Sequence, residues 1–128
     1  MKMRFGSFVA ALALMSVLPG GAEAQATVEA SAASAIVDRM PDGVATTFPL
    51  DVGEVFCWTR VTGAADTTIR HVWIHGEMEF EVPLSIGGSP WRTWSSKRIP
   101  EEWAGDWRVE IRDEAGNLLD TVSFTVGG

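Results

Sequence analysis

The sequence predicts an all-β fold, an antiparallel β-sandwich of about seven strands. From Ser34 onward, short apolar runs alternate with turn signals, and Pro, Gly, Asp and Asn recur about every ten residues. Six Trp residues lie between positions 58 and 107, and each can bury a large area. About a hundred residues of this kind suffice for the core of one domain.

Residues 1–24 predict a signal peptide. Lys2 and Arg4 precede the apolar run 8–18, and Ala22-Glu23-Ala24 has the small-x-small pattern of a cleavage site. Ala24-Gln25-Ala26 offers the same pattern two residues further on. A retained anchor helix is the alternative, but the apolar run falls short of the ~20 residues that a span needs. We therefore expect a periplasmic or secreted protein with no stable membrane anchor after cleavage.

The chain after the signal peptide divides into two parts. Residues 25–33 are small and polar without a period, which predicts a flexible leader, and residues 34–128 form the β-sandwich domain. The expected strands are 34–39, 44–50 (or only a connection), 53–61, 68–75, 77–86, 90–98, 106–112 and 118–126.

A hairpin is expected over 68–86, with His75-Gly76 as its two-residue loop. Counting outward places Trp73 opposite Met78 and pairs Arg70 with Glu81 across the solvent face. The core face then collects Ile69, His71, Trp73, Met78, Phe80 and Val82. A slip of one residue would mix the two faces, so this register is favoured.

A second hairpin is expected at the end of the chain. A four-residue loop over 114–117 sets Trp107 against Phe124, whereas a three-residue loop would oppose Ile111 and Leu119. The first register is preferred.

The segment between 98 and 106 predicts a short helical turn near 100–104. Pro100 is followed by two glutamates, which suit the start of a helix. Trp103 is expected to cover the end of the sandwich.

The charge balance excludes some partners. Without Lys2, Arg4 and Glu23, the chain carries 8 basic and 16 acidic residues, a net charge near −8. Nucleic acids and anionic membranes need a basic surface, so neither is an expected partner. Cys57 is the only cysteine and cannot form an internal disulfide. A buried small hydrophobe is the favoured interpretation, and a reactive or intermolecular thiol is the alternative.

Catalytic and metal sites are poorly supported. His71 and His75 would lie ~13 Å apart on a strand, too far to share a metal ion. No nucleophile elbow occurs around Ser95 or Ser96. His71 is expected to be a polar core residue with a hydrogen bond. We expect no catalytic residues, no metal and no cofactor.

The segment WRTWSSKR, residues 91–98, is the candidate binding site. On a strand, one face carries Trp91, Thr93, Ser95 and Lys97, and the other carries Arg92, Trp94, Ser96 and Arg98; neither is apolar throughout. A Trp platform with flanking cations suits a sugar ring or an acidic group. The proposed ligand-binding residues are Trp91, Arg92, Trp94, Ser95 and Lys97. The competing interpretation is an edge strand protected by charges, with Arg92 and Trp94 stacked together.

An ordered set of short motifs resembles a bacterial family named domain of unknown function 2914. The motifs are Asp38-Arg39-Met40-Pro41, Cys57-Trp58-Thr59, His71-Val72-Trp73, Trp91 to Lys97, and Gly105 to Val109. The likeness covers roughly residues 33–126. It implies an exported immunoglobulin-like β-sandwich and brings no activity with it.

Taken together, these observations predict an exported, non-catalytic recognition module. Its partner would be a carbohydrate, a peptide or another component of the cell envelope, bound by the Trp and Arg residues of 91–98. The alternative is a structural or protein–protein interaction domain that pairs through a sheet edge and has no small-molecule ligand.

Overall fold

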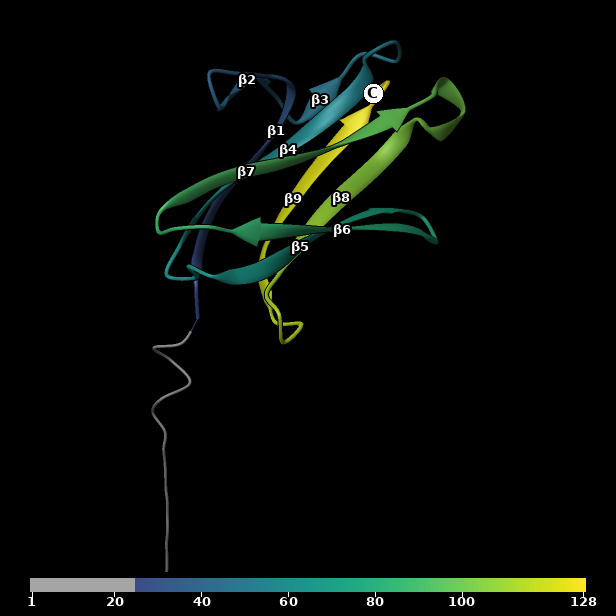
Figure 1. The fold of residues 1–128 in the computed structure, drawn as a ribbon. Helices are drawn as coiled ribbons and strands as arrows, with labels where there is room; N and C mark the ends of the chain where they lie inside the picture. Colours follow the sequence, from purple (N-terminus) through teal and green to yellow (C-terminus); the bar gives the residue numbers. More distant parts are fainter. Residues whose placement is uncertain (1–24) are drawn as a thin grey trace, which may run out of the picture.

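The computed structural model describes residues 25–128, so the predicted signal peptide lies outside the described residues. Two sheets stack face to face (Figure 1). The strands are β1 (Thr27–Val37), β2 (Met40–Val44), β3 (Thr47–Phe48), β4 (Gly53–Thr62), β5 (Thr67–His75), β6 (Met78–Ile86), β7 (Trp91–Ile99), β8 (Gly105–Arg112) and β9 (Leu118–Val126), with a 3-10 helix, η1 (Glu101–Trp103).

The strand order is that of an immunoglobulin-like sandwich, which confirms the predicted fold class. One sheet has the order β2-β1-β4-β7 and the other has the order β3-β9-β8-β5-β6. Seven of these strands have eight or more residues and build the core, while β2 and β3 are short additions at the edges. The pairing of β3 with β9 is parallel, and all other pairs among the described residues are antiparallel.

The predicted leader over 25–33 is wrong from Thr27 onward, because β1 begins there. Thr27 to Ala33 pair with β4 from Thr62 to Phe56. Val28, Ala30 and Ala32 alternate toward the core, and Ala32 is buried. Alanine gives a weak apolar signal, so this period of two is easy to overlook in the sequence.

The β5–β6 hairpin has a different loop from the predicted one. His75 pairs with Met78 and Trp73 with Phe80, so the loop is Gly76-Glu77. Gly76 takes a φ of +58°, which suits a two-residue turn with Gly first. The predicted register is off by two residues, and a shift of two keeps every side chain on its expected face. Trp73 is buried as expected.

The pairing of Arg70 with Glu81 survives this shift as a diagonal contact. Glu81 lies opposite Val72, and Pro83 lies opposite Arg70. Arg70 Nε is nevertheless 2.9 Å from Glu81 Oε2, at a geometry that does not make a well-aligned hydrogen bond. Long side chains reach across such diagonal positions on one sheet face.

The β8–β9 hairpin has the predicted register. Trp107 pairs with Phe124, and a bulge follows Ile111, where Arg112 pairs with Leu118. The turn is held by Asp113, whose carboxylate accepts hydrogen bonds from the backbone and side chain of Asn117. The hydrogen bond from the Asn117 side chain is the main reason why the pKa of the Asp113 carboxyl is lowered.

The core contains the Trp of the central strand without the disulfide that accompanies it in antibody domains. Trp73, on β5, is fully buried, and Cys57 on β4 is also fully buried. Antibody domains place a disulfide between the second and sixth core strands beside this Trp. Here the sixth core strand, β8, presents Trp107, Val109 and Ile111 inward instead. Ordinary apolar packing therefore replaces the covalent link.

Candidate functional site

Strand β7 is the edge of the four-stranded sheet and presents different residues to the core and to solvent. Its inward residues include Trp91 and Ser95, and its outward residues include Arg92 and Trp94. The five proposed binding residues are therefore divided: Trp91, Ser95 and Lys97 point inward, and Arg92 and Trp94 point outward. They do not form one ligand surface.

Trp91 and Lys97 close the two ends of the inward face. The Trp91 ring packs on Gly87, where an added Cβ would approach Trp91 Cη2 to 2.8 Å, so Gly87 is required for this contact. Lys97 Nζ lies 4.0 Å from the ring centroid of Phe80 and 5.3 Å from that of Trp103. Lys97 thus makes cation–π contacts with residues of β6 and η1. Trp103 packs against the core from η1, at the end of the sandwich where it was expected.

Ser95 belongs to a buried chain of hydrogen bonds. Trp73 Nε1 donates to Ser95 Oγ at 3.0 Å, and Ser95 Oγ is 2.6 Å from His71 Nδ1. On the other side of the ring, His71 Nε2 is 3.3 Å from Thr59 Oγ1, which donates to the Thr93 carbonyl at 2.9 Å. His71 and Thr59 are fully buried, and Ser95 is 8% exposed.

The direction of each hydrogen bond in this buried series follows from the groups at its two ends, the Thr93 carbonyl, which can only accept, and the Trp73 indole N–H, which can only donate. The Thr59 hydroxyl donates its proton to a carbonyl, so it accepts from His71 Nε2–H. His71 Nδ1 then carries no proton and accepts from the Ser95 hydroxyl, which in turn accepts from the Trp73 indole. Every polar group is satisfied when the imidazole is neutral. Burial lowers the pKa of His71 to about 4, which agrees with a neutral ring.

This Ser–His contact fits a structural role. A nucleophile and its base need to reach a substrate, whereas Ser95 and His71 lie between the two sheets with almost no exposed surface. Within residues 25–128, no three His, Cys, Asp or Glu side chains gather as a metal-ligand set. The same part of the chain contains no helix with the length and apolar character of a membrane span.

Cys57 lies in the core beside this network. It is fully buried, and burial, with a smaller contribution from the charge of Asp120, raises the pKa of its thiol to about 12. The thiolate is the reactive form, so Cys57 is an inert packing residue in the folded chain.

The outward face of the same sheet carries a different arrangement, built by the β1–β2 hairpin. Its turn residues, Asp38 and Arg39, both have positive φ, at 52° and 65°. Such values are uncommon outside Gly and are tolerated only where neighbouring contacts enforce them. Trp58, outward on β4, supplies one such contact, because its Nε1–H donates to the Arg39 carbonyl at 2.9 Å.

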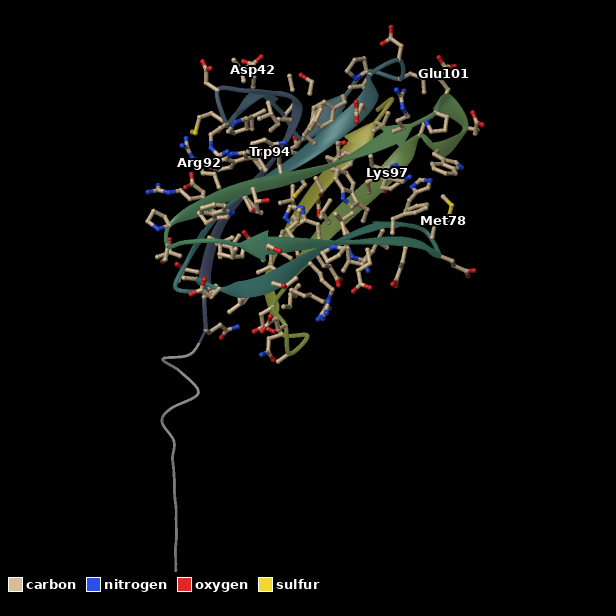
Figure 2. The ribbon with its side chains drawn as sticks, in the orientation of Figure 1. Asp42, Met78, Arg92, Trp94, Lys97 and Glu101 are labelled. Atoms are coloured by element: carbon tan, nitrogen blue, oxygen red, sulfur yellow. The ribbon has the colours of Figure 1, made fainter. Side chains whose placement is uncertain are left out.

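Arg39 reaches from this turn onto β7. Its guanidinium carbon lies 5.5 Å from the ring centroid of Trp94, and its Nη2 donates to the Arg92 carbonyl at 3.3 Å. Arg92 in turn points toward β2, where its Nη1 lies 3.3 Å from Met40 Sδ. Arg39, not Arg92, therefore stacks on Trp94. We call Arg39, Trp58, Arg92 and Trp94 the arginine–tryptophan patch; Figure 2 shows Arg92 and Trp94 beneath the β1–β2 hairpin, with Lys97 farther along β7.

Two cross-strand rows underlie the patch. Trp58 pairs with Trp94, and in the next outward row Arg60 pairs with Arg92 while Glu29 pairs with Arg60 from the other side. Like charges that lie directly opposite each other destabilise a sheet. Glu29 is 4.0 Å from Arg60, and no carboxylate of residues 25–128 lies within 4.0 Å of Arg39 or Arg92. The arrangement is therefore rich in unpaired positive charge.

A groove of about 390 Å³ opens beside these rows; we call it the Glu29–Arg92 groove. It is lined by Glu29, Met40, Trp58, Arg60, Pro90 and Arg92. A larger hollow of about 700 Å³ lies on the five-stranded sheet, where Asp106 and Arg108 are its charged lining. Arg108 is already 3.3 Å from Glu110, so that hollow has no unpaired cation to offer. The smaller groove is the better candidate site.

Sequence reasoning placed Arg92 and Trp94 on one face of the strand but missed Arg39, Trp58 and Arg60. The motif Asp38-Arg39-Met40-Pro41 was visible, yet it was assigned to the end of a strand. Asp is also favoured in tight turns and Pro is tolerated on edge strands, so the same motif fits a turn at Asp38-Arg39 that leads into β2. The alternation of β4 further shows that Trp58 and Arg60 share a face opposite to Cys57 and Thr59.

Comparisons with known proteins identify a family and distant structural likenesses. No curated protein matches this chain. The chain is similar to an engineered protein (TM-score 0.44, 15% identity, 88% of this chain and 21% of that one). It is also similar to the β-glucosidase from Listeria innocua in complex with glucose (TM-score 0.39, 12% identity, 80% and 16%) and to the GH3 β-glucosidase from Bifidobacterium adolescentis (TM-score 0.37, 12% identity, 81% and 17%). The chain thus spans about a fifth or less of these structures.

The family model described as "Protein of unknown function (DUF2914)" matches residues 66–126. The matched segment holds three of the five quoted motifs, from His71-Val72-Trp73 to Gly105–Val109, whereas the Asp38 and Cys57 motifs precede it. The expected family is confirmed by this match: residues 66–126 of this chain belong to the DUF2914 family of proteins of unknown function.

Proposed function

We propose that this domain is a non-catalytic recognition module that binds its ligand on the arginine–tryptophan patch. The ligand would be a carbohydrate, a peptide or another component of the cell envelope. The observation that carries the proposal is the direct opposition of Arg60 and Arg92 next to a Trp58–Trp94 pair. A like-charge pair that lowers stability is expected where it serves binding.

The contacts within the patch support a prearranged surface. Trp58 holds the turn through its indole N–H, and the ring of Trp94 supports the guanidinium of Arg39. A supported guanidinium loses less freedom when it binds a ligand, which favours affinity. In a domain that carries twice as many acidic as basic residues, this local positive charge also favours selective binding of an acidic group.

Intrinsic fluorescence of the mature chain tests the proposal. Titration with panels of glycans and peptides should change Trp emission for at least one ligand, and both Trp94→Ala and Arg92→Ala should abolish that change. Arg98→Ala is the matched control, because Arg98 is an outward residue of the same strand outside the patch. Circular dichroism checks that each variant is folded. A ligand that binds the Trp94 and Arg92 variants as tightly as the parent protein would refute the proposed site.

The alternative is assembly through the edge of β7. One observation favours it: β7 ends the four-stranded sheet, whereas the edge strand β6 of the other sheet carries Pro83, which lacks an N–H. Light scattering separates the two functions. Assembly through the edge would give a dimer whose mass does not depend on Trp94→Ala.

We also propose that the domain works outside the cytoplasm, in the periplasm or as a secreted protein. The sequence of residues 1–24 supports this. Expression of the full chain in a bacterium, followed by fractionation and intact mass, tests it. The expected product begins at Gln25, after cleavage at Ala24, or at Thr27, after cleavage at Ala26, and is found outside the cytoplasm. An uncleaved product in the cytoplasm would contradict the proposal.

A further inference from the structure

We infer that the ligand is an acidic sugar, a uronate-bearing saccharide whose carboxylate lies between Arg60 and Arg92 in the Glu29–Arg92 groove. This inference rests on the proposed function and adds the chemical class of the ligand and the groove that holds it.

The groove has the build of a site for one compact group. Its volume of about 390 Å³ falls in the range of small-molecule sites. Trp58 is only 2% exposed, and its indole N–H is bound to the Arg39 carbonyl, so it forms a fixed part of the wall. Met40 and Pro90 add apolar surface, and the charged groups come from β1, β4 and β7.

The two arginines are available to an anion. Arg60 and Arg92 are cross-strand partners on the outward face, where directly opposed Cβ atoms lie ~5 Å apart. Arg92 Nη1 meets only Met40 Sδ, a weak acceptor. Arg60 lies 4.0 Å from Glu29, and both side chains are more than half exposed, so this pair is weak. A carboxylate between the guanidiniums would remove their repulsion and gain charge-assisted hydrogen bonds.

The remaining lining selects among anions. Glu29 repels a second negative charge but accepts hydrogen bonds from hydroxyl groups. A phosphate carries more charge and no hydroxyl chain, and an acidic peptide side chain offers a carboxylate without neighbouring hydroxyls. A uronate offers a carboxylate for the arginines, hydroxyls for Glu29, and C–H surface for Met40 and Pro90. Trp94 is already covered by Arg39, so a neutral sugar finds no open ring there on which to stack.

Isothermal titration calorimetry of the mature chain tests this inference with defined probes. These are the methyl glycosides of galacturonate and glucuronate, which carry one carboxylate each, a neutral methyl galactoside, a hexaglutamate peptide and inorganic phosphate. We expect binding of at least one uronate probe, weaker at higher salt, and no comparable binding of the other three. Arg92→Ala should weaken uronate binding at least tenfold, or about 1.4 kcal/mol, while Arg98→Ala changes it less than twofold. Glu29→Gln keeps an acceptor oxygen but removes the charge that repels a second anion, so it should raise the affinity for phosphate and hexaglutamate relative to that for the uronate.

The Arg92→Lys variant distinguishes a loss of binding from a loss of folding. It keeps the positive charge but lacks the guanidinium with its two parallel N–H donors, so it should also lose most uronate affinity while melting at the parent temperature. The inference is overturned if neither uronate binds, if the neutral sugar, the peptide or phosphate binds equally well, or if Glu29→Gln strengthens binding of all anions alike. If the fluorescence panel still finds a ligand that depends on Trp94 and Arg92, the proposed function stands and only the sugar class is wrong. If it finds none, both fail.

Discussion

Replacement of Ser95 by Ala should destabilise the domain far more than the loss of one hydroxyl at the surface. The Ser95 hydroxyl is the middle of the buried chain, accepting from Trp73 Nε1 and donating to His71 Nδ1. Alanine removes both contacts and supplies no replacement. A donor and an acceptor, each in a fully buried residue, are then left without a partner.

The expected loss follows from those two groups. A buried polar group without a partner costs about 1–3 kcal/mol, so two such groups give about 2–6 kcal/mol. A domain of this size has a total stability of about 5–15 kcal/mol. Ser95→Ala should therefore remain folded at room temperature but lose a large share of its free energy of unfolding.

Urea denaturation at pH 7, followed by Trp fluorescence, measures this loss. Ser96→Ala is the matched control, because Ser96 is the next residue on β7 and donates to Glu54 Oε2 at 2.7 Å on the outward, partly exposed face. That variant should lose less than about 1 kcal/mol. Equal losses in the two variants would refute the assignment of the Ser95 hydroxyl as the link between Trp73 and His71.

Three further predictions concern the folded state. The pKa of His71 is about 4 when folded and about 6.5 when unfolded, so the unfolded chain binds more protons between these values; stability is complete above pH 6.5 and falls by about 3 kcal/mol as the pH drops to 4. Urea midpoints between pH 7 and pH 4 check this, and a His71→Gln variant with the same pH profile would contradict it. Cys57 should react with a thiol reagent only as fast as the chain unfolds, because its thiol is buried with a pKa of about 12; rapid labelling of the native protein would show otherwise. Gly76→Ala should cost about 1–2 kcal/mol in urea, since φ is +58° and nothing lies within 4 Å of the added Cβ, so the effect is purely conformational; an unchanged midpoint would argue against this turn.

The parts of the fold that sequence reasoning predicted are those with a strong period of two. Trp107 and Val109 alternate with charged residues, and the Asp113–Asn117 turn fixes the loop, so the register of β8–β9 follows from local information. The first half of β1 lacks large apolar residues and was missed. The two-residue error in β5–β6 arose because either neighbour of Gly76 could share its loop, and both choices bury Trp73.

The candidate site was only half visible because it depends on contacts between distant segments. Arg92 and Trp94 share one face of a recognisable strand, but Arg39 reaches them from a turn 53 residues earlier than Arg92. The opposition of Arg60 and Arg92 depends on the pairing of β4 with β7, which sheet order alone decides. Period and turn signals in one sequence do not specify that order.

The order β2-β1-β4-β7 also has a consequence for how the chain assembles. The hairpins β5–β6 and β8–β9 join segments that are neighbours in the sequence. In contrast, β4 can pair with β7 only after β5 and β6, which lie between them in the sequence, have been synthesised. Pairings between remote segments are slow to form, and their loop-closure entropy is lost before the contacts repay it. We therefore expect the β4–β7 ladder to be completed late during synthesis, and the proposed ligand surface, which spans it, to be among the last features of the domain to mature.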